Sequence, residues 1–249
     1  MADDPRASGR EPPSAPVSGW GLLMVYAGAQ VGAMVLVALA TAPHQPSVAA
    51  ARSLLAVRLT YLLSPAVLLA AGLLGVRLGR LSAPATPLAR WPGAAAMLAG
   101  VGAGLLLRLA GDLIAVGEQA FTGPIAGNNP LALYPHAFPT VTARVLLVVS
   151  VGIVAPAGEE LFFRGLLFGW LRHRLGRWPA VVLAGALFGL AHVDPASAGA
   201  LLQTLPLALP MACIGAGLCL LYERYRTLWV STAAHAAVNL TAMALVLGA

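Results

Sequence analysis

The sequence predicts an all-α protein, a polytopic bundle of about seven transmembrane helices. The chain of 249 residues is 59% hydrophobic and only 10% charged, whereas a soluble domain carries about 25% charged residues. Its apolar residues fall into runs of about 20, the length of helix that crosses a bilayer core of roughly 30 Å. The net charge of +6 comes from arginines clustered between these runs, so it does not indicate nucleic-acid binding.

Seven apolar runs are candidate spans: 20–40, 54–76, 91–116, 141–171, 179–193, 198–222 and 228–247. The first has the length of a spanning helix rather than the 7–15 apolar residues of a signal peptide, which predicts that it is not cleaved. The fourth is long and the fifth is short, and both contain polar residues. The only long connection, 117–140, is rich in Pro, Gly and Asn, which break helices.

These runs divide the chain into three regions. Residues 1–18 are polar and rich in Pro and Ser, and we predict a disordered cytoplasmic tail. Residues 19–140 hold helices one to three and an extracytoplasmic loop. Residues 141–249 hold helices four to seven and the candidate catalytic residues.

Arginines mark one side of the membrane. They follow the second, fourth and sixth spans: Arg77, Arg80, Arg90, Arg172, Arg174, Arg177, Arg224 and Arg226. The alternate connections hold only Arg52. Because positive loops stay in the cytoplasm, the N-terminus is predicted to be cytoplasmic and the C-terminus extracytoplasmic. The lack of lysine and the abundance of Ala and Gly suggest a GC-rich bacterial genome. The membrane is therefore expected to be that of a bacterial cell.

Three polar motifs interrupt the apolar runs of the third region. They supply Glu159, Glu160 and Arg164 in "EELFFR", Phe188 and His192 in "FGLAH", and His235 and Asn239 in "HAAVN". On a helix Glu160 and Arg164 are i,i+4 neighbours that can pair, while Glu159 points about 100° away. Ionisable groups inside a membrane are functional candidates.

This set of side chains can hydrolyse an amide bond. A carboxylate in dry surroundings can take a proton from water, and imidazole and carboxamide groups can stabilise an oxyanion. Alternatively Glu159, His192 and His235 bind a zinc ion that activates the water. A purely structural role for the same groups is the other reading. Arg108 and Asp112, also i,i+4, are interpreted as a self-neutralised pair that faces the bundle or a water-filled cavity.

EExxxR, FxxxH and HxxxN, in this order over 141–239, resemble the CPBP family of intramembrane proteases, which includes type II CAAX prenyl proteases and bacteriocin-processing enzymes and is also called Abi. The resemblance implies that Glu159 is the catalytic base, that His192 positions the water or holds a metal, and that His235 and Asn239 stabilise the oxyanion. Arg164 and Glu160 would shape the site, and the family leaves open whether one zinc ion takes part.

We therefore expect an integral-membrane endopeptidase that cleaves a peptide or membrane-protein substrate in or beside the lipid bilayer, with no nucleic-acid partner. Its catalytic side chains are expected to meet in a cavity inside the bundle that opens toward the cytoplasm. Two rival interpretations are a membrane scaffold or immunity protein without catalysis, and a proton-coupled transporter in which Glu159, His192 and His235 relay protons.

Overall fold

The computed structural model describes residues 21, 26, 28–29, 49–77, 91–123, 136–193 and 205–247. The tail 1–18 lies outside these residues. Of the first predicted span only four residues are described, and all four are helical. The predictions for these two segments, including the uncleaved first span, stay predictions.

The described residues form helices and no strand, which confirms the all-α fold class. The helices are α2 (Ala49–Arg77), α4 (Ala94–Thr122), α6 (Val141–Val149), α7 (Ala155–Glu160), α8 (Gly169–Leu175), α9 (Arg177–Leu190), α11 (Ala208–Tyr225) and α12 (Leu228–Leu247). Two π-helical segments, η3 (Ser150–Val154) and η4 (Leu161–Phe168), join α6, α7 and α8, and a short 3-10 turn, η6 (Leu205–Leu207), precedes α11.

Four of these stretches are long and apolar enough to cross a membrane: Leu55–Leu74, Ala94–Thr122, Val141–Leu175 and Leu228–Leu247. They correspond to the predicted spans two, three, four and seven. The fifth predicted span is the shorter α9, of 14 residues, and the sixth corresponds to α11. The predicted count of seven is thus matched by helices for spans two to seven within the described part of the chain.

The end of the third span was predicted wrongly. The loop was expected from residue 117, but α4 continues to Thr122 and ends at Gly123, whose φ is 79°. A glycine inside a helix costs only about 1 kcal/mol relative to alanine, so Gly117 is tolerated there. The stop is instead Gly123, since its positive φ is the conformation that commonly ends a helix.

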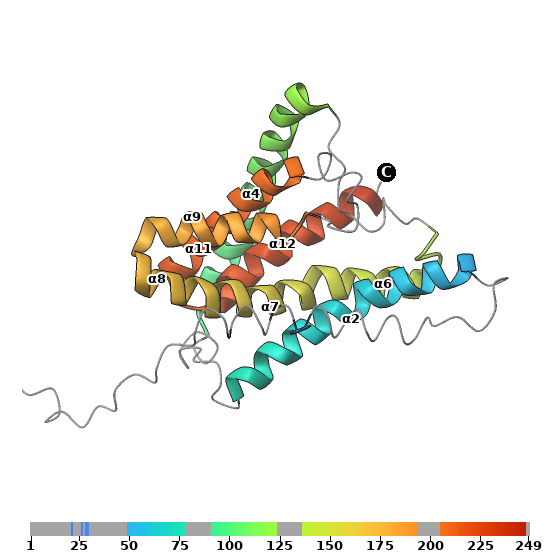
Figure 1. The fold of residues 1–249 in the computed structure, drawn as a ribbon, viewed down its shortest axis with the longest axis horizontal. Helices are drawn as coiled ribbons and strands as arrows, with labels where there is room; N and C mark the ends of the chain where they lie inside the picture. The colour runs from blue at the N-terminus through green and yellow to red at the C-terminus, as the bar shows by residue number, and fades with distance from the viewer. Residues whose placement is uncertain are drawn as a thin grey trace, which may run out of the picture.

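α2 and the run α6–α8 lie roughly along the long axis of the molecule, whereas α4 is strongly inclined to it (Figure 1). α2 lies parallel to α6–α8, as two contacts show: the Ser150 hydroxyl donates to the Tyr61 carbonyl, and eight residues further along both helices a Cβ on Gly158 would touch Leu69. α9 and α11 are antiparallel, with Gly189 against Ala208. The arginine-bearing connections therefore gather at one end of the bundle. We call this the arginine-rich end, and the opposite end the arginine-poor end.

Ion pairs connect three helices at the arginine-rich end. Glu223, near the end of α11, pairs with Arg172 of α8 and Arg177 of α9, each at 2.8 Å. Burial by itself would raise the pKa of Glu223, but the two guanidinium groups hold it below its ordinary value. This carboxylate therefore stays ionised and joins the helix connections that the sequence places in the cytoplasm.

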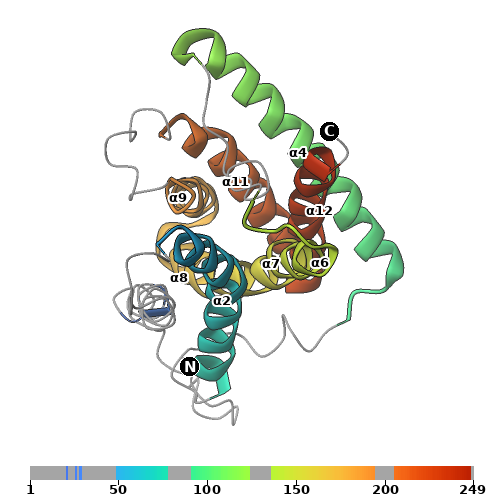
Figure 2. The ribbon, with the colours of Figure 1, turned by 90° about the vertical axis from the view of Figure 1, so that its right-hand side faces the viewer.

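α12 packs between α4 and α7 (Figure 2). α4 and α12 run parallel and in direct contact through glycine: a Cβ would lie 2.7 Å from the Val230 carbonyl oxygen at Gly100, and 2.1 Å from the Ala234 carbonyl oxygen at Gly104. Small residues of this kind let membrane helices approach closely.

Gly104→Ala is expected to destabilise the protein by about 1–3 kcal/mol, because the new methyl group forces α4 and α12 apart. Gly102→Ala is the matched control on the same helix, since nothing lies within 4 Å of a Cβ there. Thermal unfolding in detergent compares the two variants with the wild type. Equal unfolding temperatures for both variants would contradict the close contact.

Candidate functional site

The two neighbouring glutamates lie on a helix that is not regular. α7 carries Glu159 and Glu160 between the π-helical segments η3 and η4. Pro156 has no N–H for the Gly152 carbonyl four residues before it, and η3 lies at this point. π-helical turns inside α-helices are frequent at functional sites because they change the direction of side chains.

Glu160 and Arg164 form the predicted pair, and both side chains are completely buried. The Glu160 Oε1 atom accepts from Arg164 Nη1 at 2.7 Å and faces His235 Nδ1 at 2.9 Å. Arg164 Nη2 also donates to the Gly215 carbonyl of α11 at 3.0 Å. One buried network thus connects α7, η4, α11 and α12.

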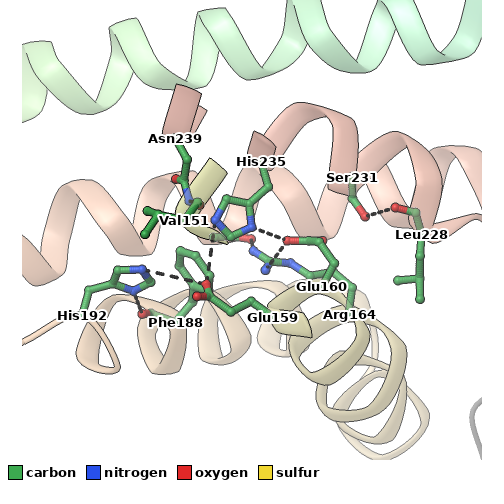
Figure 3. A network of polar contacts seen from close by, with 11 residues as sticks. Val151, Glu159, Glu160, Arg164, Phe188, His192, Leu228, Ser231, His235 and Asn239 are labelled. Atoms are coloured by element: carbon green, nitrogen blue, oxygen red, sulfur yellow. Dashed lines mark hydrogen bonds and ion pairs between the residues drawn. The ribbon is translucent and has the colours of Figure 1, made fainter. Parts of the chain in front are cut away.

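Glu159 points away from this network, as the helix geometry predicted. Its Oε2 atom lies 3.8 Å from His235 Nε2 and 4.0 Å from His192 Nε2. Oε2 is buried and accepts no hydrogen bond from the described residues, while the side chain as a whole is 22% exposed. Figure 3 shows the carboxylate facing both imidazoles.

His192 lies just beyond the C-terminal end of α9, not within a helix as the fifth predicted span had it. Its Nδ1 atom is 2.8 Å from the Phe188 carbonyl oxygen. The Phe188 ring packs against His192 and His235, with centroid distances of 4.5 and 5.4 Å, and under the Arg164 guanidinium at 4.6 Å. This ring fixes the positions of both imidazoles and the guanidinium.

Asn239 lies one turn after His235 on α12. Its Nδ2 atom donates to the Val151 carbonyl of η3 at 2.9 Å. This bond uses one of the two amide hydrogens of Asn239 and leaves the second for another acceptor. Ser231, one turn before His235, is buried and donates to the Leu228 carbonyl. The structure therefore brings together all six predicted site residues, four of them at the cavity described next.

A cavity of about 330 Å³ contains Glu159, His192, His235 and Asn239 on its wall. Four further polar residues line it that the sequence did not assign to the site: Thr60, Tyr61 and Ser64 of α2, and Arg108 of α4. The signal that could have found them is a polar side chain in the middle of an apolar run.

The cavity lies on the arginine-poor side of Glu159. Val151 and Ala155 on its wall precede Glu159 on the helix that runs toward the arginine-rich end, and Asn239 and Ala242 follow His235 on α12, which runs the other way. The buried Glu160–Arg164 network stands on the other side. The expected opening of the cavity toward the cytoplasm stays a prediction, since the cytoplasmic side is assigned from the arginine distribution alone.

The side chains predicted to bind zinc face one another, with Glu159 Oε2 at 3.8 and 4.0 Å from the two Nε2 atoms. Ligand atoms lie about 2.0–2.2 Å from zinc, and among the described residues no three His, Cys, Asp or Glu side chains are placed to hold one. The donor types are those that zinc takes. Zinc binding by these three residues stays a prediction.

The hydrogen bonds determine which nitrogen of each imidazole carries the proton. A carbonyl oxygen only accepts, so His192 Nδ1 carries a proton. Glu160 is a carboxylate opposite Arg164, so His235 Nδ1 carries one too. In the neutral imidazoles both Nε2 atoms are then acceptors. A water molecule that donates to Glu159 and to one imidazole satisfies this arrangement.

Fold and site together define an integral-membrane protein with a polar centre inside a helical bundle. The family model described as "Type II CAAX prenyl endopeptidase Rce1-like" matches residues 141–241. This match confirms the resemblance predicted from the three motifs: residues 141–241 are similar to the CPBP family of membrane proteases.

One relative of known sequence is a Bacillus subtilis (strain 168) protein named "Putative membrane peptidase YdiL". It is 26% identical over 148 residues, which cover 56% of this chain and 55% of that protein. The chain thus aligns with about half the length of this relative. No solved structure matches the chain.

Proposed function

We propose that this protein is an integral-membrane endopeptidase in which Glu159 activates a water molecule against a peptide bond. The observation that carries the proposal is the convergence of the Glu159 carboxylate with His192 Nε2 and His235 Nε2, at 4.0 and 3.8 Å, on the wall of one cavity. The family of the 141–241 region supports the same reaction class.

The proposed reaction begins with a water held between Glu159 and His192. The water oxygen attacks the peptide carbonyl carbon while its proton passes to Glu159. The negative charge that develops on the carbonyl oxygen is stabilised by His235 Nε2–H in the imidazolium form and by the second amide hydrogen of Asn239. Glu159 then delivers its proton to the leaving nitrogen as the C–N bond breaks.

Glu160 acts on this step through His235. A carboxylate bonded to the rear nitrogen of an imidazole holds its orientation and stabilises the imidazolium. Arg164 keeps Glu160 ionised, since the pair is completely buried at 2.7 Å. Both are therefore positioning residues.

The proposed mechanism activates the water with the Glu159 carboxylate and takes no step through a metal ion. A chelator tests this directly. Cleavage that survives 1,10-phenanthroline supports water activation by the carboxylate, and cleavage that is lost and returns with zinc would replace this mechanism by a metal-assisted one.

The substrates we propose are peptides or membrane proteins with a segment in or next to the bilayer of a bacterial cell membrane, and nucleic acid is no partner. The orientation of the chain, with the N-terminus in the cytoplasm, rests on the arginine distribution. Prenylated C-terminal peptides, the substrates in the family's name, are not required by this proposal.

The experiment compares membranes of cells that produce the wild type or the Glu159→Gln variant and identifies new protein N-termini by mass spectrometry. New N-termini near membrane segments, present only with the wild type, are the expected result. Identical N-termini in both, with both proteins present at equal levels, would favour the scaffold interpretation. Proton-coupled flux into vesicles without cleavage would favour the transporter.

A further inference from the structure

Arg108 is an intramembrane charge that no part of the proposed reaction uses. It lies at the midpoint of α4. A charged side chain in the middle of a membrane helix costs free energy and commonly marks a functional site. Arg108 Nη2 is 2.6 Å from Asp112 Oδ1, and its Nε is 2.9 Å from Oδ2. Both residues belong to the same helix, so this pair joins no two helices.

Three other arginines described inside the predicted spans bond outside their own helical segment. Arg58 donates to the Ala137 carbonyl, Arg144 to the Phe138 carbonyl, and Arg164 to Glu160 and to α11. These bonds hold parts of the fold together. The Arg108 side chain instead is 24% exposed, with a partner that is 45% exposed.

The packing of α4 on α12 places Arg108 close to the reaction centre. Gly104 contacts Ala234, next to His235, and the two helices are parallel. Arg108 therefore lies about one turn, roughly 5 Å, from the level of His235 toward the arginine-poor end. It lines the same cavity as Glu159 and Asn239.

We propose that Arg108 binds a carboxylate of the substrate close to the scissile bond, and so selects acidic over neutral peptides. This inference rests on the proposed function. A guanidinium has five N–H donors in a planar fork that matches a carboxylate, and the bonds to Asp112 leave Nη1 for a second one. Met211, Ile214 and Met243 add apolar surface to the same wall, and apolar surroundings strengthen the attraction between charges.

Asp112 competes with the substrate for Arg108. Removing its charge leaves the guanidinium unpaired and more attractive to a carboxylate. The two residues of the pair thus have opposite expected effects on binding, which a merely structural pair would not have.

The test measures binding of fluorescent apolar peptides to detergent-solubilised protein carrying Glu159→Gln, so that no peptide is consumed. Three peptides share one sequence: one neutral with Gln and an amidated C-terminus, one with Glu and an amidated C-terminus, and one with Gln and a free C-terminus. The first two test a side-chain carboxylate, and the third tests a terminal one.

The expected result is tighter binding of at least one charged peptide than of the neutral one. Arg108→Gln should weaken that binding about tenfold or more and leave the neutral peptide unchanged, whereas Asp112→Asn should tighten it. Arg108→Lys should retain part of the preference. Arg174→Gln removes an exposed charge at the arginine-rich end and should change nothing.

The double variant Arg108→Gln/Asp112→Asn leaves no unpaired charge, and it replaces Arg108→Gln in the test if that single variant folds poorly. It should likewise lose the preference for charged peptides. No binding of any peptide, no preference for charge, or equal weakening of all three by Arg108→Gln would overturn the inference. A charge preference without cleavage by the wild type would contradict the proposed function alone. Cleavage without charge preference would contradict only the role of Arg108.

Discussion

Replacing Glu159 by glutamine is expected to lower the rate of peptide cleavage by at least about 10²–10⁴-fold, because glutamine cannot accept the proton of the attacking water. Stability should hardly change. The Glu159 side chain is partly exposed, and its Oε2 atom accepts no hydrogen bond from the described residues. Cleavage of a peptide found from the new N-termini measures the rate, and thermal unfolding measures stability.

The control for Glu159→Gln is Glu118→Gln, which changes the same side chain near the end of α4, away from the cavity wall. It should cleave at the wild-type rate. Undiminished cleavage by Glu159→Gln would remove this residue from the reaction, and unfolding of Glu159→Gln would indicate a structural role instead.

Arg164→Met is expected to have the largest effect on stability, a loss of about 3–5 kcal/mol, because it leaves the buried Glu160 charge without its cation. Arg164 is fully buried and bonds to Glu160 and to the Gly215 carbonyl. Thermal unfolding in detergent and the yield of folded protein measure the loss.

The double variant Glu160→Leu/Arg164→Met separates the charge from the packing. Without either charge no ion is buried alone, so stability should recover in part, as apolar replacement of buried pairs often does. Cleavage should stay low, because His235 loses the carboxylate behind it. A double variant less stable than Arg164→Met would contradict this account of the network.

The local geometry of the site could be predicted because it depends on spacing along one helix. Four-residue spacing placed Glu160 beside Arg164 and turned Glu159 away, and the structure has both features. That His192 and His235 come within 4.0 Å of one carboxylate oxygen depends on packing between three helices. Spacing alone does not determine it, and the resemblance to a family supplied the expectation.

The errors have physical causes of another kind. The end of α4 was placed at Gly117 because glycine composition does not tell a tolerated helical glycine from a terminating one. His192 was placed inside the fifth span, but α9 ends at Leu190, two residues before it. Arg108 was interpreted as self-neutralised and as facing the bundle or a water-filled cavity, and the bond to Asp112 and its place on the cavity wall bear this out. That this cavity is the one with Glu159 depends on the contact of Gly104 with Ala234, which spacing along one helix does not determine.

The wide turns η3 and η4 have a consequence for how this chain tolerates change. Each π-helical turn turns the residues after it by a different angle than an α-helical turn would. Shortening or lengthening the chain by one residue within 150–168 would therefore rotate one end of this long helix against the other. Glu159 follows η3 and Arg172 follows η4 on one continuous helix. The rotation at η3 therefore sets the direction of Glu159 toward the imidazoles, and the rotation at η4 sets the direction of Arg172 toward Glu223.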